Sequence, residues 1–126
     1  METFNILLVD DEVDFVDTMA KRLELRDFVV HGVHRGEAGL EALETFPADV
    51  VVLDVMMPGI GGVEALRQIK KQYPHIEVII LTGYTSTETA IEVMEIGAFD
   101  YLIKPIAFEE LLYRLQDAYQ KKIAAS

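Results

Sequence analysis

Short apolar runs alternate with longer amphipathic segments along the chain. Several of the runs are continuous and rich in β-branched residues, which is typical of strands buried on both faces of a parallel sheet. Strands are therefore predicted at Asn5–Val9, Phe28–Val33, Val50–Leu53, Val78–Leu81 and Asp100–Ile103. The second run is the least apolar, which favours an edge position in the sheet.

The segments between these runs repeat apolar residues at the spacing of a helix face. The first predicted helix carries Val16, Met19, Ala20 and Leu23 on one face, and further helices are expected at about Glu37–Phe46, Val63–Gln72 and Phe108–Lys121. Between the last two, Thr85 and Glu88 match a capping box, with Thr85 as the cap. That helix is expected to end at Gly97.

Five alternations of strand and helix predict an α/β fold with helices on both faces of a parallel sheet. The expected architecture is a single (βα)5 doubly wound domain whose five-stranded sheet has the flavodoxin-like order 2-1-3-4-5. A length of 126 residues fits one domain over residues 1–126. The polar residues 121–126 are expected to form a C-terminal tail or the start of a linker.

Composition argues against several classes of function. The chain has 22 acidic and 11 basic residues and a net charge of −11, so nucleic acid and anionic membranes should repel it. Its apolar runs are far shorter than the roughly 20 residues that span a bilayer. The sequence shows no secretion signal, and it lacks cysteine for disulfides or thiolate metal sites. A cytoplasmic protein without direct nucleic acid or membrane binding is predicted.

Polar side chains follow four of the predicted strands. Asp10 and Asp11 follow the first strand, Asp54 the third, Thr82 the fourth and Lys104 the fifth. Because the carboxyl ends of parallel strands meet at one edge of a sheet, these side chains are expected to share a crevice. Neighbouring carboxylates disfavour one another's ionisation, and a bound divalent cation would offset this repulsion. Because all the ligands are oxygens, Mg²⁺ or Mn²⁺ is the expected ion.

Asp54 is the candidate nucleophile of this crevice. A carboxylate can attack phosphorus to form an aspartyl phosphate, whose added charge needs fixed counter-charges. Mg²⁺ on Asp11, with Asp10 nearby, and the ammonium of Lys104 would supply them, while the Thr82 hydroxyl donates a hydrogen bond. Each residue alone has an ordinary alternative as a helix-start acid, a turn former, a cap or a solvated lysine. Their combination in this order favours a site.

These segments resemble the receiver domain of two-component response regulators over nearly the whole chain. The matching residues are Asp10-Asp11, Asp54 within Leu53–Gly59, Thr82 within Leu81–Tyr84, and Lys104 within Tyr101–Pro105. The resemblance implies that Asp54 accepts a phosphoryl group from a sensor histidine kinase or a histidine phosphotransfer protein. It implies that Mg²⁺ is bound by Asp11, Asp54 and the backbone carbonyl of Met56, with Asp10 beside them. It also implies a cis peptide bond between Lys104 and Pro105.

The resemblance also assigns a switch to Thr82 and Tyr101. Movement of Thr82 toward the phosphoryl group would leave space for the Tyr101 ring, and the surface of the fourth helix, fifth strand and fifth helix would change. This surface is the implied face for a partner or a homodimer, and a downstream output domain is an implied partner. Met56 and Tyr84 flank the implied path of the hydrolytic water. Neither offers a carboxylate or amide to orient that water, so slow self-dephosphorylation is predicted.

Three other interpretations are weighed against this one. A Mg²⁺-dependent aspartyl-phosphate phosphohydrolase of the haloacid dehalogenase kind would have a second Asp where this chain has Met56. A flavodoxin-like electron carrier would need a phosphate-binding loop where this chain has Asp10-Asp11-Glu12. A degenerate receiver that acts only as a binding module would not need all five site residues. The expected protein is a signalling phosphoacceptor that catalyses only its own phosphorylation and dephosphorylation, rather than an enzyme.

Overall fold

The computed structural model describes residues 1–125. Over this range the strands form one parallel sheet of order β2-β1-β3-β4-β5, so the predicted fold class and strand order are confirmed. The elements are β1 (Asn5–Val9), α1 (Val13–Glu24), β2 (Val29–Val33), α2 (Gly36–Leu43), β3 (Val50–Leu53), α3 (Gly61–Gln72), β4 (Glu77–Thr82), α4 (Thr87–Ile96), β5 (Asp100–Ile103) and α5 (Phe108–Ala125).

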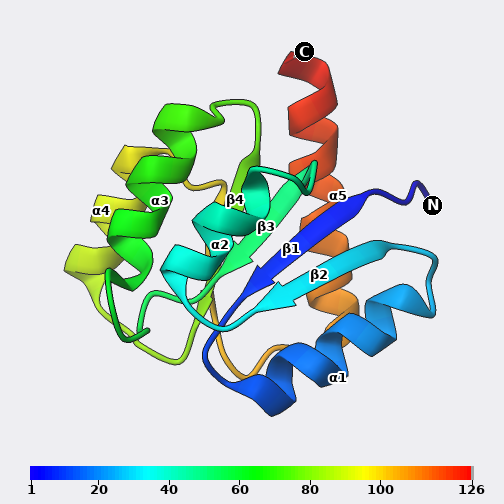
Figure 1. The fold of residues 1–126 in the computed structure, drawn as a ribbon, viewed down its shortest axis with the longest axis horizontal. Helices are drawn as coiled ribbons and strands as arrows, with labels where there is room; N and C mark the ends of the chain where they lie inside the picture. Colours follow the sequence, from blue (N-terminus) through cyan, green and yellow to red (C-terminus); the bar gives the residue numbers. More distant parts are fainter. Residues whose placement is uncertain (126) are drawn as a thin grey trace.

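The sheet is the middle of three layers. Helices α1 and α5 cover one face, and α2, α3 and α4 cover the other (Figure 1). Because successive residues of a strand point to opposite faces, Ile6 and Leu8 pack toward α1 and α5, whereas Leu7 and Val9 pack toward α2 and α3. The central strands are therefore buried on both sides, and their carboxyl ends are held in fixed positions. Within residues 1–125, no helix is both long enough and apolar enough to cross a membrane.

The start of α4 differs from the predicted capping box. The cap is Ser86 rather than Thr85, and its Oγ accepts a hydrogen bond from the Thr89 N–H at 3.2 Å. Glu88 consequently lies one residue short of the position from which a side chain bonds back to the cap. Gly97 follows the helix with a φ of 124°, in agreement with the predicted end of the helix.

The fifth helix is longer than its apolar pattern indicated. It continues through Ala125 instead of ending near Lys121, so residues 121–125, which were expected to form a tail or the start of a linker, are helical. Two ion pairs hold these last turns against the amino ends of the strands. Lys122 Nζ lies 2.6 Å from Asp49 Oδ1, and Lys121 Nζ lies 3.6 Å from Glu77 Oε1. Ser126, also part of the predicted tail, lies outside the described residues.

Helix α3 begins two residues earlier than predicted, and its first turn packs directly against the end of β3. A Cβ on Gly62 would clash with the carbonyl oxygen of Asp54 and would come within 2.6 Å of Val55 Cα. The Gly62 N–H also donates to the Val55 carbonyl oxygen at 3.0 Å. This close approach fixes the backbone of Asp54 at the edge of the sheet.

We expect Gly62→Ala to lower the free energy of unfolding by about 1–3 kcal/mol, because the added methyl group meets backbone that cannot move aside. Gly83→Ala is the matched control, since a Cβ at that exposed glycine meets no atom within 4 Å. Its effect should stay within about 0.5 kcal/mol. Urea unfolding followed by circular dichroism measures both values, and equal stabilities of the two variants would contradict the packing argument.

Candidate acidic site at the carboxyl edge of the sheet

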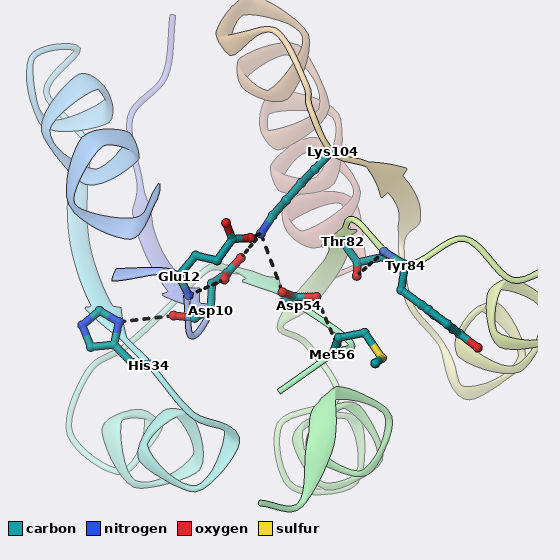
Figure 2. A network of polar contacts seen from close by, with 8 residues as sticks. All are labelled: Asp10, Glu12, His34, Asp54, Met56, Thr82, Tyr84 and Lys104. Carbon is teal, nitrogen blue, oxygen red and sulfur yellow. Dashed lines mark hydrogen bonds and ion pairs between the residues drawn. The ribbon is translucent and has the colours of Figure 1, made fainter. Parts of the chain in front are cut away.

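Two buried carboxyl groups lie side by side at the ends of β1 and β3. The two strands pair with Val9 opposite Leu53, so Asp10 and Asp54 follow at neighbouring positions. Their side chains point toward the same centre (Figure 2), although both residues are about 95% buried, with exposed fractions of 4% and 5%. Carboxylate oxygens of Asp10, Glu12 and Asp54 all lie within 4.8 Å of one another. The fold thus concentrates negative charge at one point.

Lys104 places its ammonium in the middle of these carboxylates. Its Nζ lies 2.6 Å from Asp10 Oδ2, 2.6 Å from Glu12 Oε1 and 3.6 Å from Asp54 Oδ2 (Figure 2). The ammonium also lies 4.4 Å from the centre of the Phe15 ring, a distance suited to a cation–π contact. The peptide bond between Lys104 and Pro105 is cis, as the family resemblance implied.

The protonation of this cluster reflects burial and charge together. Burial raises the pKa of Asp10 above its ordinary value of 3.8, and the charge of Asp54 adds to this effect. The Lys104 ammonium and the Glu12 N–H lower the Asp10 pKa without cancelling the effect of burial. Burial also acts to lower the pKa of Lys104, but its carboxylate partners outweigh this effect and the Lys104 pKa is raised. Lys104 is therefore held as a cation, and ionised Asp10 is not fully compensated.

The two oxygens of Asp54 have different surroundings. Oδ1 accepts a hydrogen bond from the Met56 N–H at 3.0 Å, which fixes the orientation of the carboxyl group. Oδ2 is the oxygen that faces Lys104. The Met56 side chain is 56% exposed and lies beside Asp54 in Figure 2. The carboxyl group is therefore oriented by the backbone and offers one oxygen toward the ammonium.

Thr82 lies at the end of β4, on the other side of Asp54 from Asp10 (Figure 2). It is fully buried, and its Oγ1 accepts a hydrogen bond from the Tyr84 N–H at 3.1 Å. The Tyr101 hydroxyl donates to the carbonyl oxygen of the same Tyr84 at 2.5 Å. The backbone of Tyr84 thus joins the threonine at the site to the tyrosine on β5.

The structure brings four of the five predicted site residues to this edge: Asp10, Asp54, Thr82 and Lys104. Asp11 is exposed and is not among the three clustered carboxylates, so its predicted role as a metal ligand stays a prediction. Glu12 takes part instead, and sequence reasoning missed it. The available signal was its place at the end of the Asp10-Asp11-Glu12 run.

His34 was also missed as a neighbour of the site. Its Nδ1 lies 3.2 Å from the carbonyl oxygen of Asp10, within hydrogen-bonding distance. His34 follows β2, whose carboxyl end lies next to that of β1 in the sheet. The order of the strands therefore places this histidine at the same edge.

The donor atoms of the cluster suit a hard divalent cation. Carboxylate oxygens are the ligands that Mg²⁺ prefers, and the excess of negative charge over the single ammonium favours a cation. Asp10, Glu12 and Asp54 are the described residues close enough to one another to hold one. The site therefore fits a magnesium ion chemically.

An acidic crevice with a lysine and a threonine, at the point where the winding of a five-stranded parallel sheet reverses, defines a receiver-type signalling domain. Residues 6–116 match the response regulator receiver domain, and the chain belongs to this family. The family is that of the signalling proteins of two-component systems, as the site residues suggested.

Similar proteins include longer transcriptional regulators. The regulatory protein AtoC of Escherichia coli is 36% identical over 91% of this chain and 25% of its own length. The uncharacterized transcriptional regulatory protein YkoG of Bacillus subtilis is 37% identical over 96% of this chain and 53% of its own length. The chain thus spans between a quarter and about half of the length of these relatives.

Solved structures of receiver domains share the fold over almost the whole chain. A CheY-like receiver domain protein from Methanospirillum hungatei is 26% identical, with a TM-score of 0.95 and coverage of 99% of this chain and 100% of that one. The BeF3-activated DrrB receiver domain is 34% identical, with a TM-score of 0.84 and coverage of 94% and 99%.

The raised pKa of Asp10 leads to a prediction about stability. Between the ordinary value of 3.8 and the raised folded value, the folded protein binds more protons than the unfolded chain, so stability falls as pH rises through this window. The stability lost in this window is not regained at neutral pH, where Asp10 is ionised in both states. We therefore expect Asp10→Asn to raise the free energy of unfolding at pH 7 without divalent cations, because an amide avoids the burial of charge and still accepts a hydrogen bond from Lys104.

Urea unfolding as a function of pH checks this expectation. The difference between Asp10→Asn and the wild type should shrink as pH falls below 3.8, where the carboxyl group is protonated in both states. Asp14→Asn, an exposed acid in the first turn of α1, is the matched control and should not stabilise the protein. A destabilised Asp10→Asn at pH 7 would contradict the electrostatic account.

Proposed function

We propose that Asp54 accepts a phosphoryl group from a phosphohistidine of a sensor kinase or a histidine phosphotransfer protein, in a Mg²⁺-dependent reaction in the cytoplasm. The observation that carries this proposal is the setting of the Asp54 carboxyl group. It is buried, it is oriented through Oδ1 by the Met56 N–H, and its Oδ2 lies 3.6 Å from the ammonium of Lys104. A fixed nucleophile beside a fixed cation suits phosphoryl transfer, which depends mainly on positioning and charge stabilisation.

In the proposed step, Asp54 Oδ2 attacks phosphorus while the P–N bond to the donor histidine breaks. The imidazole, which carries a proton on its other nitrogen, leaves as a neutral ring with the electron pair of that bond. The Lys104 ammonium shifts toward one phosphoryl oxygen, and the Thr82 hydroxyl donates to another. When bound, Mg²⁺ would supply further positive charge beside the phosphoryl group, and Asp10, Asp11, Asp54 and the Met56 carbonyl are the residues expected to hold it.

The hydrogen bonds of Tyr84 support a switch through Thr82 and Tyr101. If the Thr82 hydroxyl turns toward the phosphoryl group, the Tyr84 N–H loses its acceptor, and the carbonyl that holds the Tyr101 hydroxyl is free to move. The following helix can respond, because within the described chain Val93 is the only buried residue of α4. A local change of charge thus reaches an element with few core contacts.

The α4–β5–α5 surface is the proposed output face. It exposes apolar side chains from all three elements: Ile91, Met94, Ile103 and Tyr113. Exposed apolar groups of this kind favour contact with a partner, which we propose to be a second copy of the chain or a downstream output domain. The greater length of AtoC and YkoG supports the second of these partners.

The proposed function predicts a gain of one phosphoryl mass when the protein is incubated with acetyl phosphate and Mg²⁺. Intact-mass spectrometry should detect the gain in the wild type and in Asp14→Asn, but not in Asp54→Asn or in the presence of EDTA. An equal gain in Asp54→Asn would show that the phosphoryl group is attached to another residue, and it would refute the proposed role of Asp54.

Self-dephosphorylation provides a separate prediction. The exposed side chains of Met56 and Tyr84 offer no carboxylate or amide to orient a water molecule at Asp54. We expect Met56→Asn combined with Tyr84→Ala to shorten the half-life of the phosphorylated form, because an amide can hold that water and the bulk of the ring is removed. The measurement is the decay of phosphorylated protein by intact mass after removal of the donor.

Leu25→Asn combined with Val29→Ala is the control, since it makes similar changes at exposed apolar positions outside both the site and the α4–β5–α5 surface. Its half-life should equal that of the wild type. If the Met56 and Tyr84 variant decays no faster than this control, the two side chains do not limit the hydrolysis.

A further inference from the structure

We propose that Glu12 is a positioning residue that holds the Lys104 ammonium in the unphosphorylated protein and thereby slows the phosphorylation of Asp54. The proposal rests on the proposed function of Asp54 and adds a residue that controls its rate. It concerns a side chain outside the pair of acids that the sequence assigned to the site.

The position of Glu12 gives its side chain no other evident task. Glu12 is the N-cap residue of α1, but in the described structure its side chain makes no capping hydrogen bond to the helix. Instead, Oε1 lies 2.6 Å from Lys104 Nζ, although the Glu12 side chain is 62% exposed to solvent. A single ion pair with Lys104 thus holds the exposed Glu12 side chain next to the site.

This ion pair competes with the contact that phosphorylation requires. Lys104 Nζ is 2.6 Å from both Asp10 and Glu12 but 3.6 Å from Asp54 Oδ2. The two short contacts hold the ammonium away from Asp54, so a shift of Nζ toward a phosphoryl group on Asp54 lengthens at least one of them. Asp10 is buried and stays at the centre of the site, whereas the Glu12 side chain is 62% exposed and can turn into solvent. Glu12 is therefore the partner that selectively favours the unphosphorylated arrangement.

The surroundings give Lys104 room to change partners. A cavity of about 510 Å³ borders the ammonium and is lined by Glu12, Phe15, Gly83, Lys104, Pro105 and Ile106. On this side the Lys104 side chain borders open space, so a change of its rotamer displaces no core residue there. The cost of the change is then mainly the loss of the ion pair with Glu12.

Glu12→Gln tests the proposal, because it removes the charge and keeps the shape of the side chain. Asp14→Asn is the matched control, since it removes one charge from the exposed first turn of the same helix. Initial rates of Asp54 phosphorylation are measured by intact mass with Mg²⁺ and with two small donors, the dianion acetyl phosphate and the less negatively charged phosphoramidate. We expect Glu12→Gln to react roughly two- to fivefold faster with both donors, the range for an ion pair with one exposed partner.

The second donor distinguishes two effects of Glu12: its ion pair with Lys104, and its electrostatic repulsion of a negatively charged phosphodonor. Acceleration with acetyl phosphate alone would mean that Glu12 only repels anions, and it would overturn the proposal. Equal rates for Glu12→Gln and Asp14→Asn would overturn it too. If neither the wild type nor any variant gains a phosphoryl group, the proposed function itself is wrong, and the role of Glu12 falls with it.

A readout without metal or donor completes the test. Relaxation of the Lys104 side-chain ¹⁵N signal in NMR reports the mobility of the ammonium, and the signal is assigned by its loss in Lys104→Arg. Glu12→Gln should increase this mobility, while Asp14→Asn should leave it unchanged. Unchanged mobility in Glu12→Gln would show that Glu12 does not hold Lys104, whatever the rates are.

Discussion

The contact of Lys104 with Asp10 and Glu12 is the interaction on which the site depends. Pairing of β1 with β3 places the carboxyl groups of Asp10 and Asp54 together in a buried position, where like charges destabilise one another. The compensating cation comes from the end of β5, and β4 lies between β3 and β5. The long lysine side chain therefore spans the edge of the sheet, so the site exists only when β1, β3, β4 and β5 have come together.

Compensation of the acids by one ammonium is incomplete. The pKa of Asp10 is raised because burial destabilises the ionised carboxyl group more than Lys104 stabilises it. A site in this condition gains stability from any additional positive charge, whether a proton or a metal ion. The same arrangement allows a change of charge at Asp54 to redistribute Lys104 and Thr82, whose neighbours reach the surface through Tyr84 and Tyr101.

The sequence was sufficient to predict the strands, their order and most of the site. Continuous β-branched runs mark buried strands, and the edge at which parallel strands end collects the residues that follow them. This reasoning correctly brought together Asp10, Asp54 and Lys104. It could not decide which residue after Asp10 contacts Lys104, because that depends on the backbone path of the loop. Glu12 is extended there, with φ −79° and ψ 93°, and its side chain reaches Lys104.

The missed helix end has a similar cause. Local pattern predicts an end near Lys121, but Asp49 and Glu77 pair with the last lysines from positions 73 and 44 residues earlier in the chain. Such contacts between distant segments leave no periodic signal in the sequence.

Thermal unfolding with increasing Mg²⁺, at constant ionic strength, tests the central claim most directly. If the edge of the sheet is an undercompensated acidic site, Mg²⁺ should raise the Tm of the wild type in a concentration-dependent way, because it binds the folded state. The rise should be lost when Asp10 and Asp54 are both replaced by Asn. A wild-type Tm that does not respond to millimolar Mg²⁺, or an equal rise in the double variant, would contradict the account.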